Sequence, residues 1–284
     1  MKAIEQARQV AMKRRARVVF PETDDPRVAA AMARLKSEGV AEPIGIVDKS
    51  QAQKDVLIAR RGLKPSIASR MLDRPLIRAA AMLAVGEADV MVAGAGVPTK
   101  KVIEAAGLAV GLRPEVEAPS SFFLLEFPNG RALILADCAV NVAPNVTELS
   151  AIAHASAQSA QRLLGRADVA LLSYATGQSG TGASVDLVRD VARLTGFAGP
   201  IQVDAALNPI IAARKGAGGA GAANTLIFPN LDAGNIAYKL LCELAGAKAY
   251  GPFLQGYRRP ICDLSRSASE DEIYISTLLA IAQA

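Results

Sequence analysis

The sequence predicts an α/β fold with a largely parallel sheet. Segments with apolar residues at helical spacing alternate along most of the 284 residues with short runs of Val, Ile and Leu. Such runs are typical of strands buried on both faces. One pair of runs instead flanks Pro128-Asn129-Gly130, which predicts an antiparallel hairpin. Alternating strands and helices imply right-handed crossovers, and these place helices on both faces of the sheet.

The elements follow in the order that these patterns give. A helix at 2–14 precedes a strand at 17–21, and Asp24-Asp25-Pro26 then provides the acidic cap and first-turn proline of a helix that ends near Gly39. The remaining strands are predicted at 43–47, 88–93, 121–127, 131–136, 168–173, 200–204 and 225–228, and the remaining helices at 75–86, 98–110, 147–164, 184–195, 208–214, 232–245 and 270–283. The patterns assign no element between 48 and 74 or between 246 and 269.

Composition and charge argue against a nucleic-acid partner. The formal net charge is only +5, and aromatic residues make up 4% of the chain. The longest basic cluster, Lys13-Arg14-Arg15, has no aromatic residues interleaved with it, whereas single-stranded nucleic acid is bound by stacking on aromatic side chains. The same charge is better suited to loops that face a small anionic substrate.

Histidine, cysteine and hydropathy exclude further classes. The single histidine, His154, rules out metal sites built from several histidines, and it lies off the apolar stripe of helix 147–164, so we expect it at the surface. Cys138, Cys242 and Cys262 are odd in number and far apart, which argues against a disulfide framework and structural zinc. No apolar run is long enough to cross a membrane, and the N-terminus lacks a signal-peptide core. We therefore expect a cytoplasmic protein without metal or membrane partner.

Two glycine-containing loops are candidates for anion binding. Ser173–Gly182 follows a predicted strand and leads into a helix, so its N–H groups and hydroxyls could face an anion, although an ordinary loop would show the same pattern. Ala93–Lys100 is a second loop of this kind. Gly216–Gly221 matches GxGxxG, but a helix precedes it and a strand follows, the reverse of a dinucleotide site, so we interpret it as a flexible connection. No Walker A motif is present.

A third candidate combines a hydroxyl, a guanidinium and several carboxylates. Asp263-Leu264-Ser265-Arg266 is followed by Glu270-Asp271-Glu272. The acids also fit a plain capping segment, because Ser269 precedes them and acidic residues favour a first helical turn. Both interpretations can hold together.

Several segments together resemble the phosphate acetyltransferase / phosphate butyryltransferase family, more closely its acetyltransferase branch. They occur in family order over nearly the whole chain: Phe20–Arg27, Gly86–Asp89 with Gly94, Ala136–Asn141, Leu172–Gly177, Gln202–Ala206, Ile227–Leu231, Ala233–Lys239, Tyr250–Pro252, Leu254–Gly256 and Asp263–Arg266. The resemblance implies two α/β/α domains with an interdomain cleft, similar to isocitrate and isopropylmalate dehydrogenases. The first domain would take 1–111 plus 252–284 and the second 112–251, in a homodimer.

The resemblance also implies an activity and a set of site residues. The family transfers an acyl group reversibly between acyl phosphate and coenzyme A, without a metal, an acyl-enzyme or a permanently bound cofactor, so that coenzyme A is a substrate. By motif position Ser265 and Arg266 would contact the oxyanion and the phosphate. The basic carboxylate would be Glu272, with Asp271 one residue earlier. The candidate substrate-binding residues are Ser173, Thr176, Gly177, Ser179 and Gly180 of the first glycine loop, Asn235 in one of the family segments, and Lys100, Arg60 and Arg61 as substitutes where the chain departs from the family pattern.

Two departures from the family pattern leave alternatives open. Glu104 stands where the family places a phosphate-binding arginine, and a carboxylate there would repel phosphate. The segment around 58–62 is shorter than usual, so Arg60 or Arg61 would have to substitute, and Lys100 or Lys101 would have to compensate for Glu104. One alternative is a catalytically weakened member that binds acyl-CoA or acts in regulation or assembly. Another is a fold-related dehydrogenase, although the chain lacks a nucleotide fingerprint and clustered metal-binding aspartates.

Overall fold

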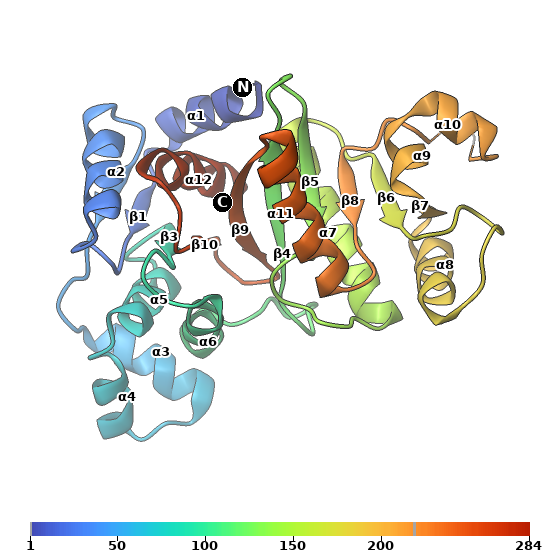
Figure 1. Ribbon diagram of the computed structural model, residues 1–284. Helices are drawn as coiled ribbons and strands as arrows, with labels where there is room; N and C mark the ends of the chain where they lie inside the picture. The colour runs from blue at the N-terminus through green and yellow to red at the C-terminus, as the bar shows by residue number, and fades with distance from the viewer. Residues whose placement is uncertain (1, 218–219) are drawn as a thin grey trace. The chain divides into compact units, whose positions relative to one another are not determined.

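The computed structural model describes residues 2–217 and 220–284 (Figure 1), and the chain divides into two compact units. Unit 1 comprises Met1–Pro119 and Tyr250–Ala284, and unit 2 comprises Ser120–Ala249. Both units combine helices with a mainly parallel set of strands, which confirms the α/β class. The domain boundaries implied by the resemblance, after residues 111 and 251, stay a prediction.

In unit 1 the strands lie in the order β2-β1-β3-β10-β9. All neighbours are parallel except β10 and β9. The strand bounds are β1 Arg17–Val19, β2 Glu42–Ile44, β3 Val90–Ala93, β9 Lys248–Gln255 and β10 Ile261–Asp263, and the helices are α1 Lys2–Arg14, α2 Pro26–Ser37, α3 Gln51–Arg61, α4 Pro65–Met71, α5 Pro75–Val85, α6 Thr99–Ala109 and α12 Glu270–Gln283. Because β1, β3 and β10 are parallel, the segments that follow them emerge at one edge of the sheet, where α/β proteins bind ligands.

In unit 2 the strands lie in the order β4-β5-β8-β6-β7. The predicted hairpin is present as the antiparallel pair β4 and β5, and the other neighbours are parallel. The strand bounds are β4 Ser120–Glu126, β5 Ala132–Ala136, β6 Val169–Leu172, β7 Ala198–Ile201 and β8 Thr225–Ile227, and the helices are α7 Val146–Leu164, α8 Ala183–Thr195, α9 Val203–Leu207, α10 Pro209–Arg214 and α11 Leu231–Ala245. The segments after β5, β6, β7 and β8 share one sheet edge.

Side-chain caps fix where several helices begin. The Asp25 side chain accepts from the Arg27 N–H and Pro26 opens α2, as the sequence predicts. A capping box begins α12, because Ser269 and Glu272 each bond the other's backbone N–H. Gly86 ends α5 in the left-handed region at φ +81°, where a residue without a Cβ is favoured.

Three segments differ from the sequence prediction. The strand predicted at 200–204 ends at Ile201, and α9 begins at Val203 because Ala205 and Ala206 turn into the core while Asp204 pairs with Lys215. Helices α3 and α4 fill the unassigned stretch after 48, and strands β9 and β10 fill part of the stretch after 246. Gly251-Pro252 is a pair of residues typical of turns, yet β9 continues through it. Burial of these residues in the sheet outweighs their local preference.

The surface of the molecule agrees with two expectations from the sequence. His154 is exposed and contacts the ring of Phe197 at a centroid distance of 5.1 Å. The flanks of the Gly216–Gly221 segment are α10 before it and β8 after it, as predicted, while Gly218 and Gly219 lie outside the described residues.

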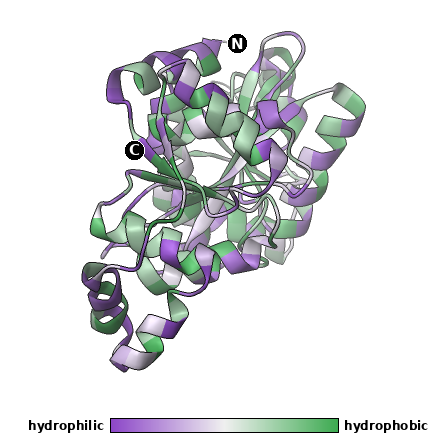
Figure 2. Ribbon diagram, turned by 90° about the vertical axis from the view of Figure 1, so that its left-hand side faces the viewer, coloured by the Kyte–Doolittle hydropathy of each residue, from purple (hydrophilic) through white to green (hydrophobic). Residues whose placement is uncertain are grey.

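In Figure 2 the helices carry hydrophilic and hydrophobic residues side by side, whereas the central strands are mostly hydrophobic. No helix within the described residues is long and apolar enough to cross a membrane.

Candidate active site

The turn between β10 and α12 presents Ser265 and Arg266 to solvent. The Leu264 N–H donates to the Ala93 carbonyl at 2.7 Å, which ties the end of β10 to β3, and the Ala268 N–H closes the turn on the Ser265 carbonyl at 2.9 Å. Both Ser265 and Arg266 are exposed. The Ser265 hydroxyl lies 2.9 Å from that of Ser267, and the Arg266 guanidinium has no hydrogen bond or ion pair within the described part of the chain. The turn therefore offers a hydroxyl and an unpaired cation side by side.

The two candidate bases, Asp271 and Glu272, occupy the first turn of α12 and are both engaged. Oε2 of Glu272 accepts from the N–H and the hydroxyl of Ser269 at 2.7 and 2.9 Å. Asp271 pairs with Arg34 at 2.5 Å. Nearby, burial raises the pKa of Tyr250 to about 12, and the charges of Glu272 and Asp271 add to the rise, so this hydroxyl stays protonated. The capping interpretation of the acids is thus confirmed for Glu272.

The glycine loop after β3 is filled by a carboxylate of the chain itself. The N–H groups of Gly94, Ala95 and Gly96 donate to the two carboxylate oxygens of Glu22 at 2.8, 3.0 and 2.7 Å. Consecutive N–H groups of this kind form an anion-binding concavity, and here the anion is a side chain from the segment after β1. Lys100 follows in the first turn of α6 and is exposed. The loop amides are therefore not available to a substrate phosphate.

Beneath this loop lies a buried acid, Asp263, at the end of β10. Its Oδ2 accepts a 2.5 Å hydrogen bond from the Thr99 hydroxyl, and its Oδ1 is buried without a partner in the described part of the chain. Burial raises the pKa of Asp263 to about 7, opposed by the Thr99 bond and reinforced by the charge of Glu22. Gly94, at φ +108°, leaves room for this carboxylate, because a Cβ there would lie 2.2 Å from Oδ1.

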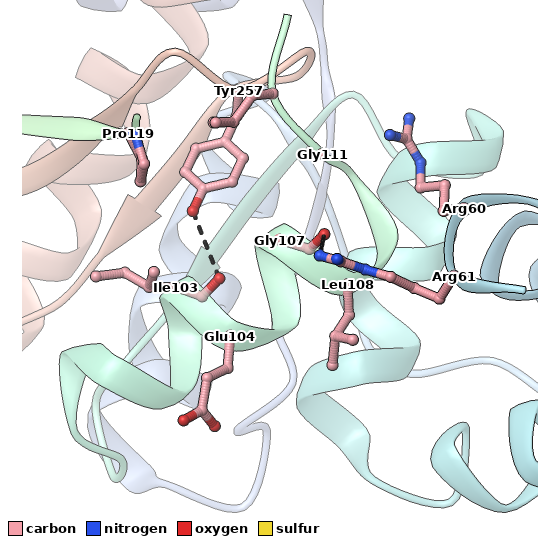
Figure 3. A pocket seen from close by; sticks show the side chains of 10 residues that line it. Arg60, Arg61, Ile103, Glu104, Gly107, Leu108, Gly111, Pro119 and Tyr257 are labelled. Atoms are coloured by element: carbon pink, nitrogen blue, oxygen red, sulfur yellow. Dashed lines mark hydrogen bonds between the residues drawn. The ribbon is translucent and has the colours of Figure 1, made fainter. Parts of the chain in front are cut away.

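Arg60 and Arg61 line a pocket of about 820 Å³ within unit 1 (Figure 3), together with Glu104 and Tyr257. The Arg61 guanidinium donates to the Gly107 carbonyl at 2.5 Å. Nε of Arg60 is buried without a partner among the described residues, and burial together with the charges of Arg258 and Arg61 lowers the Arg60 pKa. The pocket thus carries partly unsatisfied positive charge, as an anion site requires.

Glu104 also lines this pocket, but it is paired with a lysine of its own helix. Its carboxylate pairs with Lys101 at 3.0 Å on the surface of α6. Figure 3 shows the Glu104 side chain directed away from Arg60 and Arg61. Lys101 is one of the two lysines that the sequence offered to compensate for Glu104, and neither Lys101 nor Lys100 is among the residues that line the pocket. Compensation by either lysine stays a prediction.

In unit 2 the predicted loop joins β6 to α8 and is held by neutral groups. The N–H of Thr176 donates to the Ser179 hydroxyl at 2.9 Å, and that of Ala175 donates to the Ser173 hydroxyl at 3.3 Å. Gly177 donates to the Pro200 carbonyl at 2.9 Å. A Cβ on Gly180 would approach the Ala175 Cβ to 2.7 Å, so the loop doubles back tightly there. The loop is therefore held in shape by serine and threonine hydroxyls, which accept hydrogen bonds from backbone N–H groups.

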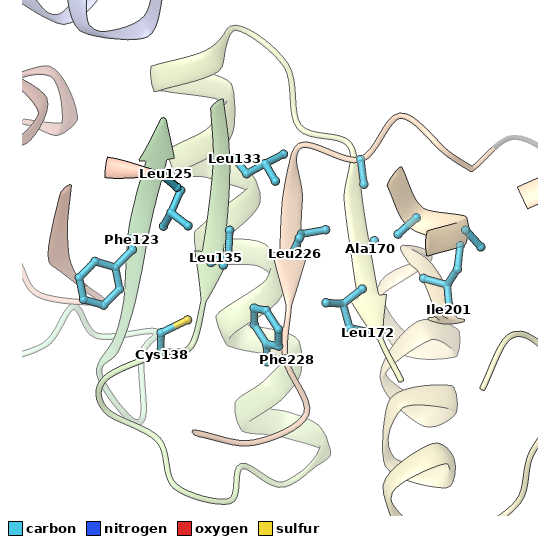
Figure 4. Close-up of a cluster of buried hydrophobic side chains, with 14 of the residues drawn as sticks. Phe123, Leu125, Leu133, Leu135, Cys138, Ala170, Leu172, Ile201, Leu226 and Phe228 are labelled. Carbon is cyan, nitrogen blue, oxygen red and sulfur yellow. The ribbon is translucent and has the colours of Figure 1, made fainter. Parts of the chain in front are cut away.

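Asn235, the last predicted binding residue, stabilises a neighbouring loop. Its side-chain amide donates to the Cys138 carbonyl at 3.0 Å. Asp137 is buried and accepts from the N–H groups of Ala139 and Asn141 at 3.0 Å each. Cys138 belongs to the buried cluster of unit 2 in Figure 4, and burial raises its thiol pKa. The conspicuous block Ala136–Asn141 thus positions backbone around a buried acid.

The predicted residues therefore fall into groups rather than a single cluster. Ser265 and Arg266 lie in the turn that leads into α12, and Asp271 and Glu272 lie in the first turn of that helix. Arg60 and Arg61 share one pocket, and the residues from 173 to 180 share one loop. Sequence reasoning missed the roles of Glu22 and Asp263. Glu22 and Asp263 lie inside quoted motif blocks, and an acidic residue at or shortly after the carboxyl end of a buried parallel strand was the signal that could have identified them.

Comparison with known proteins places the chain in a family. A family model described as phosphate acetyl/butaryl transferase matches residues 53–281. The chain belongs to this family. The phosphate acetyltransferase of Nitrosomonas europaea is 34% identical over 93% of this chain, but the chain spans only 44% of that relative's length. A solved phosphotransacetylase from Streptococcus pyogenes superposes with a TM-score of 0.91 at 30% identity, covering 99% of this chain and 97% of its own.

A more distant likeness concerns the fold alone. A putative 4-hydroxythreonine-4-phosphate dehydrogenase from Salmonella typhimurium superposes over 95% of this chain with a TM-score of 0.51 at 14% identity. This bears out the expected relation of the phosphate acetyl/butaryl transferase fold to a dehydrogenase fold.

Proposed function

We propose that this chain is a phosphate acyltransferase that moves an acyl group, acetyl by preference, reversibly between acyl phosphate and coenzyme A. The observation that carries this proposal is the likeness to the Streptococcus pyogenes phosphotransacetylase over nearly the whole of both chains. The exposed Ser265–Arg266 turn adds chemical support, because it presents a hydroxyl donor and an unpaired guanidinium together.

The reaction needs one proton acceptor and donors for two oxyanions. A carboxylate takes the proton of the coenzyme A thiol, and the thiolate attacks the carbonyl carbon of the acyl phosphate. The new C–S bond forms, the C–O bond to phosphorus breaks, and phosphate leaves with the electron pair of that bond. The Ser265 hydroxyl and the Arg266 guanidinium stabilise the negative charge that develops on the carbonyl and phosphate oxygens.

A direct attack agrees with the state of two cysteines. Cys138 and Cys262 are buried, and burial raises the pKa of each thiol well above its ordinary value. A thiol of this kind is a poor nucleophile, because the thiolate is the reactive form. Neither is therefore suited to carry an acyl-enzyme.

Glu272 is the better candidate for the base. The capping box holds the Glu272 carboxylate through Oε2 alone, so Oε1 can accept a proton without breaking the box. Asp271 is instead paired with the Arg34 guanidinium, which would compete with an incoming proton. A Glu272→Gln variant with a kcat far below that of Asp271→Asn would agree with this assignment, and the reverse order would move the role to Asp271.

The phosphate groups of coenzyme A are assigned to the positive side chains of unit 1. Arg60 and Arg61 line the pocket beside α6, and Lys100 is exposed on the same helix. The 173–180 loop and Asn235, both in unit 2, stay candidate substrate contacts on the strength of the family resemblance.

A homodimer is part of the proposal. Ile236, Leu240 and Leu244 lie one turn apart on α11 and are 57%, 51% and 82% exposed. Lys239 and Glu243 border this stripe on one side, so an antiparallel two-fold pairing of α11 with its copy brings opposite charges near each other. Light scattering should give a dimer for the wild-type chain and a monomer for Leu240→Glu, with Leu194→Glu on α8 as the exposed control. A Leu240→Glu variant that stays dimeric would contradict this interface. Three free cysteines agree with a cytoplasmic location.

The activity is tested by mixing acetyl phosphate with coenzyme A and following thioester absorbance, with propionyl and butyryl phosphate in parallel. We expect thioester formation with acetyl phosphate fastest. Retained coenzyme A binding without turnover on any of the three would instead support the weakened, acyl-CoA-binding member.

A further inference from the structure

We propose that Arg27 is a positioning residue that fixes the backbone of the Ser265–Arg266 turn, an inference that rests on the proposed acyl transfer. Arg27 lies in the first turn of α2. Its Nη1 donates to the carbonyls of Arg266 and Ala268 at 2.9 and 2.8 Å, and its Nη2 donates to the carbonyl of Ala95 at 3.1 Å. One side chain thus joins the segments that follow β1, β3 and β10.

The pattern of acceptors requires a guanidinium. Besides the three carbonyls, Asp25 accepts from Nε and Nη2 at 3.1 and 2.7 Å, which fixes the plane of the fork. A guanidinium provides five N–H donors in a rigid planar arrangement, whereas a lysine ammonium provides three at a single point. Lysine at this position can keep the charge but cannot reach both loops and Asp25 together.

Glu22 and Arg27 both bind the main chain of the glycine loop, Glu22 through its N–H groups and Arg27 through a carbonyl. Glu22 accepts from the N–H groups of residues 94–96, and Arg27 donates to the Ala95 carbonyl between them. The loop is therefore a rigid support, and the 265–268 turn is anchored to it through the same guanidinium. The segment 22–27 thereby sets where the turn lies.

Arg27 binds the main chain of Arg266 and leaves the Arg266 guanidinium available for substrate. It holds the Arg266 main-chain carbonyl, while the Arg266 guanidinium has no partner in the described part of the chain. A donor on a fixed backbone needs little reorganisation when charge develops in the transition state, and a displacement of about 1 Å can cost a hundredfold in rate. Loss of Arg27 should therefore lower kcat more than it weakens substrate binding.

A second arginine in unit 1 supplies a matched control. Arg17 pairs with Asp89 at 2.8 Å and donates to the Gly86 carbonyl at 2.8 Å, so it makes the same kinds of contact without touching either loop. We compare Arg27→Lys with Arg17→Lys in the full chain. Both should lower the melting temperature, but only Arg27→Lys should lower kcat, by at least about tenfold, with KM for coenzyme A changed less than threefold. Added methylguanidine should restore part of the rate of Arg27→Ala and leave the rate of Arg17→Ala unchanged.

Hydrogen exchange provides a measurement that does not depend on turnover. The Ala268 amide, which bonds the Ser265 carbonyl, and the amides of 94–96 should exchange faster in Arg27→Lys than in Arg17→Lys. A wild-type chain without acyl transfer would overturn the proposed function and leave this exchange result standing. Equal kcat in Arg27→Lys and wild type, or equal exchange in both lysine variants, would overturn the role of Arg27.

Discussion

The loops that follow β3 and β6 are both rich in glycine, but their backbone amides have different partners, a carboxylate in the first and neutral hydroxyls in the second. In the loop after β3, a full negative charge from Glu22 occupies three consecutive amides. In the loop after β6, Thr176 and Ala175 donate to neutral serine hydroxyls, and the amides of Gly180 and Thr181 have no acceptor within the described residues. A glycine loop after a parallel strand thus becomes a candidate anion site only where the chain supplies no anion of its own.

The largest expected effect comes from removing the internal anion. Glu22→Ala leaves three amides without their charged acceptor, and each hydrogen bond to a charged group contributes about 1.5–3 kcal/mol. We expect the free energy of unfolding to fall by roughly 5 kcal/mol in a urea titration. Because the vacated amides then resemble those of the loop after β6, inorganic phosphate should restore part of the loss in Glu22→Ala and have less effect on the wild-type chain. Equal stabilisation of both by phosphate would contradict this account of the loop.

The next effect is a pH dependence of stability that arises from Asp263, which lies beneath the β3 loop. The Asp263 pKa of about 7 exceeds the unfolded value of about 3.9, so the folded chain binds more protons between these values. This contribution to stability is complete below pH 4 and is lost as the pH rises through 7, by up to about 4 kcal/mol. Asp263→Asn should remove this slope in urea titrations at pH 5 and pH 7.5. A slope that persists in Asp263→Asn would assign it to another group.

A smaller effect is expected in the loop after β6. The Thr176 hydroxyl accepts from the Gln202 N–H at 3.1 Å, so Thr176→Val leaves this donor unpaired at a cost of about 1.5 kcal/mol. If the loop contacts coenzyme A, KM for coenzyme A should rise several-fold while kcat changes little. Thr181→Val, at an exposed position of the same loop, is the control. An unchanged KM in Thr176→Val would remove the loop from the binding site.

The smallest effect concerns Glu104. Its pair with Lys101 is exposed, and such pairs contribute about 0.2–0.5 kcal/mol. Glu104→Gln should therefore leave the melting temperature almost unchanged. If the wild-type chain transfers acyl groups and Glu104→Gln has nearly the same KM for coenzyme A, this carboxylate does not face the substrate. A large drop in KM would place it against a phosphate group.

Sequence patterns correctly predicted the elements that local turn and capping signals define. The β4–β5 hairpin follows from Pro128-Asn129-Gly130 between two apolar runs, and the start of α2 follows from Asp25-Pro26. They failed at α9 and β9, because Val203 and Gly251-Pro252 have local preferences that tertiary packing overrides.

The candidate site was predictable only as far as its motifs lie close together in the chain. Ser265, Arg266, Asp271 and Glu272 lie within eight residues of one another, in the turn before α12 and in its first helical turn. The occupancy of the β3 loop by Glu22 joins residues 72 positions apart, and the contact of Arg27 with Arg266 spans 239. Pairings of this range depend on strand order, which periodicity does not specify.

The most direct test of the proposed chemistry is the initial rate of thioester formation from acetyl phosphate and coenzyme A by wild type, Ser265→Ala and Arg266→Ala, with Ser37→Ala at the exposed end of α2 as the control. We predict turnover in wild type and Ser37→Ala, and a kcat at least about tenfold lower in each of the other two variants. Rates in Ser265→Ala and Arg266→Ala equal to that of the wild type would contradict the placement of the reaction at this turn.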